Sequence, residues 1–231
     1  MRVEDLTKTL DQSALAEDLT PEQLTAVCDE VRELHVAALC SWPQFVPLMV
    51  EQLRGCDVKV CTVIDFPLGD GGSEAKVAQA ERAVEEGVDE IEVVMNYRAM
   101  LAGDFGAARD ELRAVTRAVR SRAANGGRGD VLIKVIIEAP RLDDKLSRLA
   151  CLIVEDAGAD FAKTCTGVGT AATVHDVELM RDALSESVGV KAAGGVRTLE
   201  DVQTLVGAGA ARGGTSAAPQ VLAELQALNG S

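Results

Sequence analysis

A lysine inside an apolar segment is the most chemically suggestive residue of the sequence. Lys163 lies in 160-DFAKTC-165, directly before a turn rich in threonine and glycine. Removing an ammonium group from water is costly, so a lysine in a buried strand usually has either a partner or a chemical role. Burial favours the neutral amine, and a neutral amine can attack a carbonyl carbon. From these residues alone, a nucleophilic lysine and a structural lysine paired with a buried acid are about equally well supported.

Three further charged residues lie in the middle of apolar segments that are typical of strands. They are Glu92, Lys134 and Lys191. Side chains alternate between the two faces of a strand, and this alternation places all three, together with Lys163, at matching depth in four consecutive strands. Such a set predicts a reaction site. One lysine forms an imine, a second ammonium lowers the pKa of the first amine by repulsion, and the carboxylate moves protons.

The order of the predicted elements indicates how these residues meet. Strands are predicted at residues 8–11, 35–40, 58–66, 89–96, 131–138, 160–165, 189–193 and 210–214, and helices lie between them. The first of these helices begins after the N-cap Thr20, with Pro21 at its first position, and ends near Leu34. Apolar strands that alternate with helices are typical of a parallel sheet that is covered on both faces. Eight such units predict an α/β fold, a single (β/α)8 barrel over residues 1–231 with a short N-terminal lead-in helix. An open, doubly wound sheet is the alternative, but no GxGxxG follows the first strand.

Composition and charge exclude several classes of function. The formal net charge of −14 argues against nonspecific binding to nucleic acid or to an anionic membrane. The six cysteines form no CxxC pair and show no metal-ligand spacing, and no signal peptide is present, so we expect a reduced, cytoplasmic protein without a metal. The two histidines, His35 at a strand start and His175 at a helix start, are not expected to take part in catalysis.

Glycines follow the last two predicted strands, in 194-GGVRT-198 and 212-RGGTSA-217. Barrel enzymes bind phosphate at this position, through backbone N–H groups and a helix N-terminus. The location of these two turns therefore favours a phosphate site over plain connecting loops.

The chain resembles the deoxyribose-phosphate aldolases, a family of class I aldolases that act through a lysine Schiff base. The matching segments follow the order of the family and cover most of the chain: 58-VKVCTVIDFPLG-69, 89-DEIEVVMN-96, 131-VLIKVIIEAP-140, 159-ADFAKTCTGVGTAATVHDVELM-180, 189-GVKAAGGVRTLED-201 and 210-AARGGTSA-217. The resemblance implies a reversible reaction in which 2-deoxyribose 5-phosphate gives acetaldehyde and glyceraldehyde 3-phosphate. It also implies that neither a metal nor an organic cofactor takes part.

The resemblance assigns roles to particular residues. Lys163 would be the Schiff-base lysine, Lys191 the lysine that tunes it and Lys134 a further lysine of the pocket. Glu92 would stand at the proton-relaying position, and Asp11 and Cys40 would match pocket positions on the first two strands. The residues expected to bind the substrate and its phosphate are Thr166, Gly167, Gly194, Gly195, Gly214 and Ser216.

Several positions depart from the pattern of the family. Glu92 replaces an aspartate, and its added methylene displaces the carboxylate. Catalysis is sensitive to displacements of this size. The other departures are Gln12, Asp65, Val168, Gly213 and Ala217. Among them, Asp65 is expected to bring a negative charge toward the mouth of the site.

These departures leave two alternatives open. One is a family member that forms the same imine with a different carbonyl compound, such as an unphosphorylated one, which Asp65, Gly213 and Ala217 in particular suggest. The other is a barrel that binds sugar phosphates with impaired catalysis. In each case the expected partner is a small aldehyde or sugar phosphate, without nucleic acid or membrane, and the family suggests a homodimer.

Overall fold

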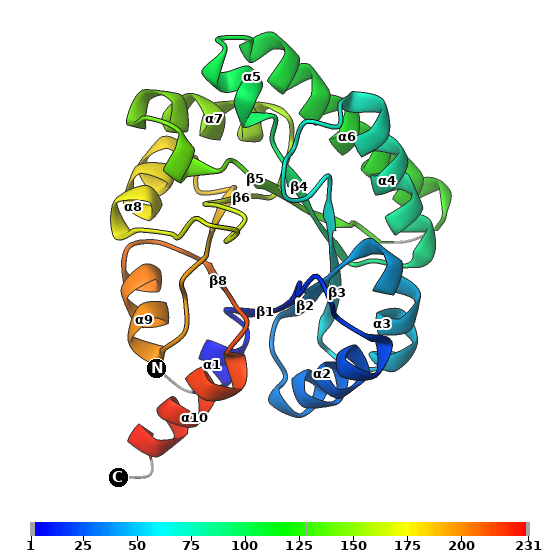
Figure 1. The fold of residues 1–231 in the computed structure, drawn as a ribbon, viewed down its shortest axis with the longest axis vertical. Helices are drawn as coiled ribbons and strands as arrows, with labels where there is room; N and C mark the ends of the chain where they lie inside the picture. The colour runs from blue at the N-terminus through cyan, green and yellow to red at the C-terminus, as the bar shows by residue number, and fades with distance from the viewer. Residues whose placement is uncertain (1–2, 128, 230–231) are drawn as a thin grey trace.

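The computed structural model describes residues 3–127 and 129–229, in which eight parallel strands close into a barrel surrounded by helices (Figure 1). The strands are β1 Leu10–Ala14, β2 Ala38–Ser41, β3 Lys59–Ile64, β4 Glu90–Val94, β5 Leu132–Ile136, β6 Phe161–Lys163, β7 Gly189–Ala193 and β8 Arg212–Thr215. Each strand pairs with the next in the chain, and β8 pairs with β1. The predicted (β/α)8 barrel is therefore confirmed.

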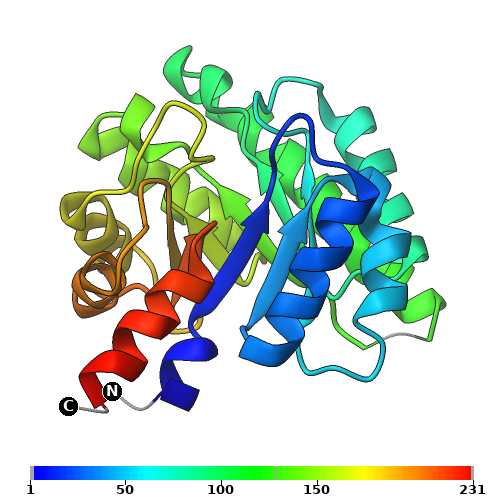
Figure 2. The same ribbon diagram turned by 60° about the horizontal axis from the view of Figure 1, so that its bottom comes forward.

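Helices cover the outside of the barrel. They are α1 Val3–Thr7, α2 Pro21–Leu34, α3 Val46–Gln52, α4 Ser73–Glu86, α5 Tyr97–Leu101, α6 Phe105–Asn125, α7 Asp144–Asp156, α8 Val174–Ala183, α9 Leu199–Gly207 and α10 Ala218–Asn229, with 3-10 turns at Pro43–Phe45 and Ala139–Arg141. The predicted lead-in helix is α1, which lies beside α10 (Figure 2). The N-terminus of α2 is as predicted, because Thr20 forms a capping box with Gln23.

Strand starts differ from the prediction by up to three residues, and local turns explain the differences at β1 and β2. The first strand was expected at residues 8–11, but Lys8 and Thr9 form a turn, and Thr9 Oγ1 donates to the carbonyl of Leu6 at 2.8 Å. His35 does not open β2, because it ends α2 in the left-handed conformation at φ 53°, and its N–H donates to Val31. The short helix α5 was not predicted at all. At both strand starts a local turn replaces the extended backbone that hydrophobicity alone suggests.

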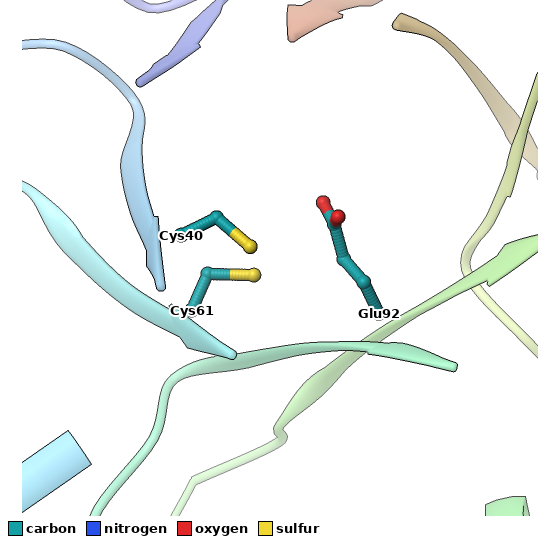
Figure 3. Close-up of side chains that lie close together, drawn as sticks. All are labelled: Cys40, Cys61 and Glu92. Atoms are coloured by element: carbon teal, nitrogen blue, oxygen red, sulfur yellow. The ribbon is translucent and has the colours of Figure 1, made fainter. Parts of the chain in front are cut away.

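The apolar core lies mainly between the barrel and the helices. Outward-facing strand residues such as Val93, Ile133 and Val190 are fully buried there. The inside of the barrel holds only a small apolar cluster among the described residues, Ala38, Cys40, Cys61 and Val63. Figure 3 shows the thiols of Cys40 and Cys61 pointing into the barrel toward Glu92. The rest of the interior is therefore available to polar side chains.

Candidate active site

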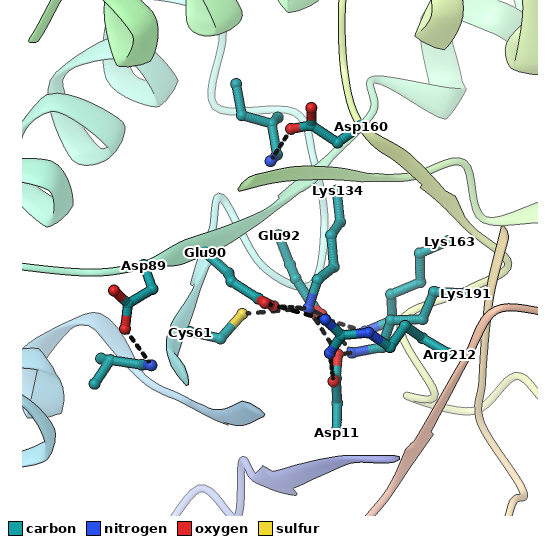
Figure 4. Close-up of polar contacts among 12 residues, drawn as sticks. Asp11, Cys61, Asp89, Glu90, Glu92, Lys134, Asp160, Lys163, Lys191 and Arg212 are labelled. Atoms are coloured by element: carbon teal, nitrogen blue, oxygen red, sulfur yellow. Dashed lines mark hydrogen bonds and ion pairs between the residues drawn. The ribbon is translucent and has the colours of Figure 1, made fainter. Parts of the chain in front are cut away.

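Seven charged side chains from six strands meet inside the barrel (Figure 4). This charged cluster consists of Asp11, Glu90, Glu92, Lys134, Lys163, Lys191 and Arg212. The strand register explains the convergence, because Glu92 lies opposite Lys134, and Lys191 lies between Lys163 and Arg212. Residues opposite one another in parallel strands point to the same side of the sheet, which here is the barrel interior.

Glu92 is the carboxylate that the three lysines share. Its Oε2 accepts a hydrogen bond from Lys163 Nζ at 2.7 Å. Its Oε1 accepts from Lys191 at 2.5 Å and from Lys134 at 3.3 Å. Lys163 therefore has one carboxylate oxygen to itself, whereas the other two lysines divide the second.

Asp11 and Glu90 compensate the remaining positive charge. Asp11 Oδ2 accepts from Lys134 at 2.7 Å and from Lys191 at 2.6 Å, while its Oδ1 accepts from Arg212 at 2.6 Å. Glu90 Oε2 forms an ion pair with Lys134 at 2.5 Å, and Arg212 lies 3.4 Å from Glu90 Oε1. Every buried carboxylate in the cluster thus has at least two cationic partners.

The ionisation of the cluster follows from these contacts. Burial alone would raise the pKa of Asp11 and Glu92, but the surrounding cations lower the pKa of each carboxyl well below its usual range. Burial alone would likewise lower the pKa of Lys134 and Lys191, but Asp11 and Glu92 raise the pKa of both ammonium groups. These four residues are therefore charged at neutral pH.

A cavity of about 540 Å³ opens at the carboxyl ends of the strands, and Lys163 lies on its wall. It is the only member of the charged cluster that lines the cavity, and its side chain is 3% exposed. Lys134 and Lys191 are fully buried beneath it. A small molecule in the cavity could therefore reach the amine of Lys163 and no other lysine of the cluster.

The predicted binding residues divide into two groups. Thr166, Gly167, Gly194, Gly195, Gly214 and Ser216 all line the cavity. Cys40 does not, because it faces the barrel interior, and neither do Asp11, Glu92, Lys134 and Lys191. Only glycine fits at position 194, because the backbone there has φ 93° and a Cβ would lie 2.8 Å from the carbonyl oxygen of Thr170. Gly214 makes room for the side chain of Lys191, because a Cβ at position 214 would lie 3.0 Å from Cε of Lys191.

Three of the departures from the family pattern lie away from the cavity. The prediction that Asp65 directs charge toward the mouth is wrong, because its carboxylate accepts from Gly71 N at 2.9 Å and lies 3.5 Å from Lys76. A side chain at Gly213 would meet Leu10 and Val202. The backbone N–H of Ala217 donates to Thr215 Oγ1 at 2.9 Å, and Ala217 does not line the cavity. None of these three residues therefore forms part of the cavity wall.

Gln12 and Val168 do lie at the cavity. Gln12 joins β1 to the start of α10, because its amide donates to Ser216 O at 3.2 Å and accepts from Ala218 N at 3.1 Å. Val168 is half-exposed, at 53%.

Sequence reasoning missed three polar residues of this region. Glu90 and Arg212 belong to the charged cluster, and the two-residue period that identified Glu92 would also have found Glu90. Glu138 follows β5 in the left-handed conformation, at φ 56°. Its carboxylate accepts from Thr166 N at 2.9 Å and Thr170 Oγ1 at 2.7 Å, and so holds the loop that lines the cavity. No local sequence pattern predicts such a contact between residues distant in the chain.

Cys40, Cys61 and Glu92 are close enough to be considered as metal ligands, with donor atoms within 4.8 Å of one another (Figure 3). The donor set does not fit a metal ion. Burial raises the pKa of the Cys61 thiol well above its ordinary value, whereas metals bind the thiolate. Glu92 is already shared by three lysines, and the ammonium groups of Lys134 and Lys191 would repel a cation.

Both histidines are remote from this chemistry. His35 pairs with Asp57, and His175, which lies near the start of α8, pairs with Asp144. Both side chains are mainly exposed. In the described part of the chain, no helix is long and apolar enough to cross a membrane.

Comparison with known proteins places this architecture among aldolases. The model of the DeoC/LacD family aldolases matches residues 5–218. A deoxyribose-phosphate aldolase of Caldanaerobacter subterraneus subsp. tengcongensis is 42% identical over 221 residues, 95% of this chain and 93% of the relative. One from Micrococcus luteus is 43% identical over 219 residues, 94% of this chain and 95% of the relative.

Solved structures agree with these sequence relatives. An aldolase described as QR15 superposes with a TM-score of 0.89 at 32% identity and covers 97% of each chain. The deoxyribose-phosphate aldolase of Aeropyrum pernix, described as a unique tetramer, gives a TM-score of 0.88 at 31% identity, with 98% of this chain and 93% of that chain covered.

Proposed function

Because the chain belongs to the DeoC/LacD aldolase family, we propose that it is a class I aldolase that reversibly cleaves 2-deoxyribose 5-phosphate to acetaldehyde and glyceraldehyde 3-phosphate. The observation that carries this function is the position of Lys163. It alone of the charged cluster lines the cavity, and a carboxylate lies 2.7 Å from its amine.

Lys163 is proposed to form the covalent intermediate. Its neutral amine attacks C1 of the open-chain sugar, and loss of water from the resulting carbinolamine gives an imine. The protonated imine withdraws electrons from C2. The C2–C3 bond then breaks, the C3 hydroxyl loses its proton and glyceraldehyde 3-phosphate departs. The enamine that remains on Lys163 is protonated at C2, and hydrolysis of the imine releases acetaldehyde and the free amine.

Glu92 is proposed to move the protons of these steps. Its Oε2 lies 2.7 Å from Lys163 Nζ. That separation is within the hydrogen-bond reach that general acid–base catalysis requires. Lys191 and Lys134 hold the other carboxylate oxygen and fix its position. Asp11 holds these two lysines in turn from the opposite side of the barrel.

The phosphate is proposed to bind where β7 and β8 end. Gly194 and Gly195 expose backbone there, and Ser216 and Arg197 lie on the same wall of the cavity. The N-terminus of α9, which Thr198 caps, follows directly and favours a negative charge.

The alternative of an unphosphorylated substrate loses its motivation. It rested on Asp65, Gly213 and Ala217, and none of these residues lines the cavity. The arrangement around Gly194, Gly195 and Arg197 supports a phosphorylated acceptor instead.

The test compares retro-aldol rates on 2-deoxyribose 5-phosphate and 2-deoxyribose. We expect kcat/KM to be at least about 100-fold higher for the phosphorylated sugar, because several charge-assisted hydrogen bonds depend on the phosphate. Replacement of Arg197 by Met should reduce that preference and leave the rate on 2-deoxyribose nearly unchanged. Equal rates on the two sugars would contradict the proposal, and binding of either sugar without turnover would favour the barrel with impaired catalysis.

We further propose that the protein self-associates, as a homodimer. The Aeropyrum pernix relative described as a tetramer supports assembly in general. Light scattering of the purified protein should give about twice the mass of one chain, and a monomeric mass would contradict this.

We also propose a cytoplasmic location. All six cysteines are free thiols, and Cys40 and Cys61 remain so although they face each other across β2 and β3. Cell fractionation with antibody detection should find the protein in the cytoplasmic fraction, and recovery from another compartment would contradict this.

A further inference from the structure

The charged cluster holds more cations than carboxylates. Its four cations are Lys134, Lys163, Lys191 and Arg212, and its three carboxylates are Asp11, Glu90 and Glu92. If every group were ionised, the barrel interior would carry one positive charge without a partner, which is unfavourable where water is excluded. Loss of a single proton from one cation removes this excess.

Arg212 is not the group that gives up the proton. A guanidinium stays charged in proteins. Burial opposes its charge, but Asp11 and Glu90 outweigh burial and raise the pKa of Arg212. Its side chain is 16% exposed and lies over the ring of Phe161, 6.0 Å from the ring centre. This cation–π contact holds the guanidinium inside the barrel.

The two deep lysines are held in their charged form by several carboxylates each. Lys134 contacts Asp11 at 2.7 Å and Glu90 at 2.5 Å, and Lys191 contacts Asp11 at 2.6 Å and Glu92 at 2.5 Å. Lys163 contacts Glu92 alone among the carboxylates of the cluster. It is also the member that lines the cavity, through which a proton can leave.

Arg212 decides how much negative charge is left for the lysines. It takes Oδ1 of Asp11 at 2.6 Å and lies 3.4 Å from Glu90. Without it, three lysines would face three carboxylates and each could keep its proton. With it, the same three carboxylates compensate only two lysines.

Every strand contributes a titratable side chain to the charge balance around Lys163. These side chains are Asp11 on β1, Cys40 on β2, Cys61 on β3, Glu90 and Glu92 on β4, Lys134 on β5, Lys163 on β6, Lys191 on β7 and Arg212 on β8, with Arg197 on the cavity wall and with Glu138 and Cys165 beyond the ends of β5 and β6. Glu138 does not enter the count of ion pairs, because its carboxylate accepts from Thr166 N and Thr170 Oγ1. The thiol of Cys61 does not alter the count, since burial and its hydrogen bond with Cys40 raise its pKa well above the ordinary value.

We propose that Arg212 is a positioning residue whose fixed charge inside the barrel keeps Lys163 in its neutral, nucleophilic form. This inference rests on the proposed imine at Lys163. It gives Arg212 an effect on catalysis although the residue neither lines the cavity nor touches Lys163.

The experiment measures imine formation as a function of pH. Wild type, Arg212→Met and Arg212→Lys are incubated with acetaldehyde from weakly acidic to strongly alkaline pH, reduced with borohydride and analysed by mass spectrometry, with circular dichroism to verify folding. In Arg212→Met, half-maximal trapping should move up by about one pH unit, the effect of a unit charge within roughly 10 Å in a protein interior. Its alkaline plateau should equal that of the wild type, and Arg212→Lys should keep the wild-type midpoint.

Glu90→Gln provides an independent variant should Arg212→Met fold poorly. Removing a carboxylate that pairs with Arg212 and Lys134 increases the excess positive charge, so its midpoint should move to lower pH. Unchanged midpoints in the variants, or a lowered plateau in Arg212→Met and Arg212→Lys without a shift, would overturn the inference while the wild-type adduct still supports the aldolase. Absence of an adduct in the wild type would contradict the proposed function and this inference together.

Discussion

Two buried lysines in this protein show that burial alone does not indicate chemistry. Lys76 on α4 is fully buried outside the barrel, and Lys163 on β6 is 3% exposed inside it. Lys76 donates to the carbonyl oxygens of Gly69 at 2.9 Å and Val94 at 2.8 Å, and to the carboxylate of Glu111. An ammonium has three donors, and in Lys76 all three are used.

Lys163 has one hydrogen-bond partner among the described residues, Glu92, and its remaining donors lie beside a cavity. The environment of Lys76 satisfies a charge permanently. That of Lys163 places an amine next to a proton acceptor and leaves it open to a small molecule. The difference between a structural and a chemical lysine therefore lies in the number of partners and in access.

The largest effect on activity is expected from Lys163→Met. Loss of the nucleophile should lower kcat at least about 1,000-fold, because no other lysine of the cluster reaches the cavity. A retro-aldol assay measures the rate, and circular dichroism should show an unchanged fold. Residual activity within tenfold of wild type would show that the amine of Lys163, like that of Lys76, is not the nucleophile.

Changes at Glu92 should have the next largest effect. Glu92→Gln removes the proton acceptor beside Lys163 and should lower kcat about 100-fold or more. Glu92→Asp keeps the charge but shortens the side chain by a methylene, so the contacts with Lys191 at 2.5 Å and with Lys163 at 2.7 Å lengthen. Because catalysis is sensitive to such displacements, kcat of this variant should fall about tenfold. Steady-state kinetics of both variants test this order, and an aspartate variant faster than wild type would show that the longer carboxylate serves another purpose.

The charged cluster should also make stability depend on pH. The depressed pKa values of Asp11 and Glu92 stabilise the fold above their ordinary values of 3.8 and 4.5, and this contribution is lost as the pH falls through the lowered values. The raised pKa values of Lys134 and Lys191 stabilise the fold below 10.5, and that contribution is lost at more alkaline pH. Between these limits the contribution of the cluster to the melting temperature should be nearly independent of pH. A melting temperature that rises as the pH falls below 3.8 would contradict this assignment.

The smallest effect on activity is expected from Lys76→Met. The variant leaves the carboxylate of Glu111 buried without its ammonium and should cost about 3–5 kcal/mol of unfolding free energy. The folded fraction should retain the kcat of the wild type, since Lys76 does not line the cavity. Urea denaturation and active-site titration with a borohydride-trapped aldehyde separate the two quantities. A large fall in kcat per folded molecule would remove the distinction between the two lysines.

Periodic patterns explain which parts were predictable from the sequence. The barrel and the convergence of Glu92, Lys134, Lys163 and Lys191 follow from alternation along strands, which depends on neighbours in the chain. Features set by contacts between distant residues could not be found in this way. Lys76 lies in a segment with the appearance of an exposed helix and is buried because the turn that contains Asp65 and Gly69 folds over it.

Residues in the left-handed backbone conformation account for two errors of the sequence-based prediction. His35 was predicted to open a strand, but it ends a helix at φ 53°. Asp65 has φ 50° and binds within its own turn, so its carboxylate faces away from the cavity. Left-handed backbone is uncommon for residues other than glycine. Aspartate and histidine adopt it more often than most residues, but their presence alone does not predict it.

Trapping the imine tests the central claim most directly. The protein is incubated with acetaldehyde, reduced with borohydride and digested, and the modified peptide is identified by mass spectrometry. We predict an ethyl group on Lys163, lost in Lys163→Met and absent from Lys76, Lys134 and Lys191. Modification of one of those three lysines in place of Lys163, or no adduct in a protein that cleaves 2-deoxyribose 5-phosphate, would contradict the account.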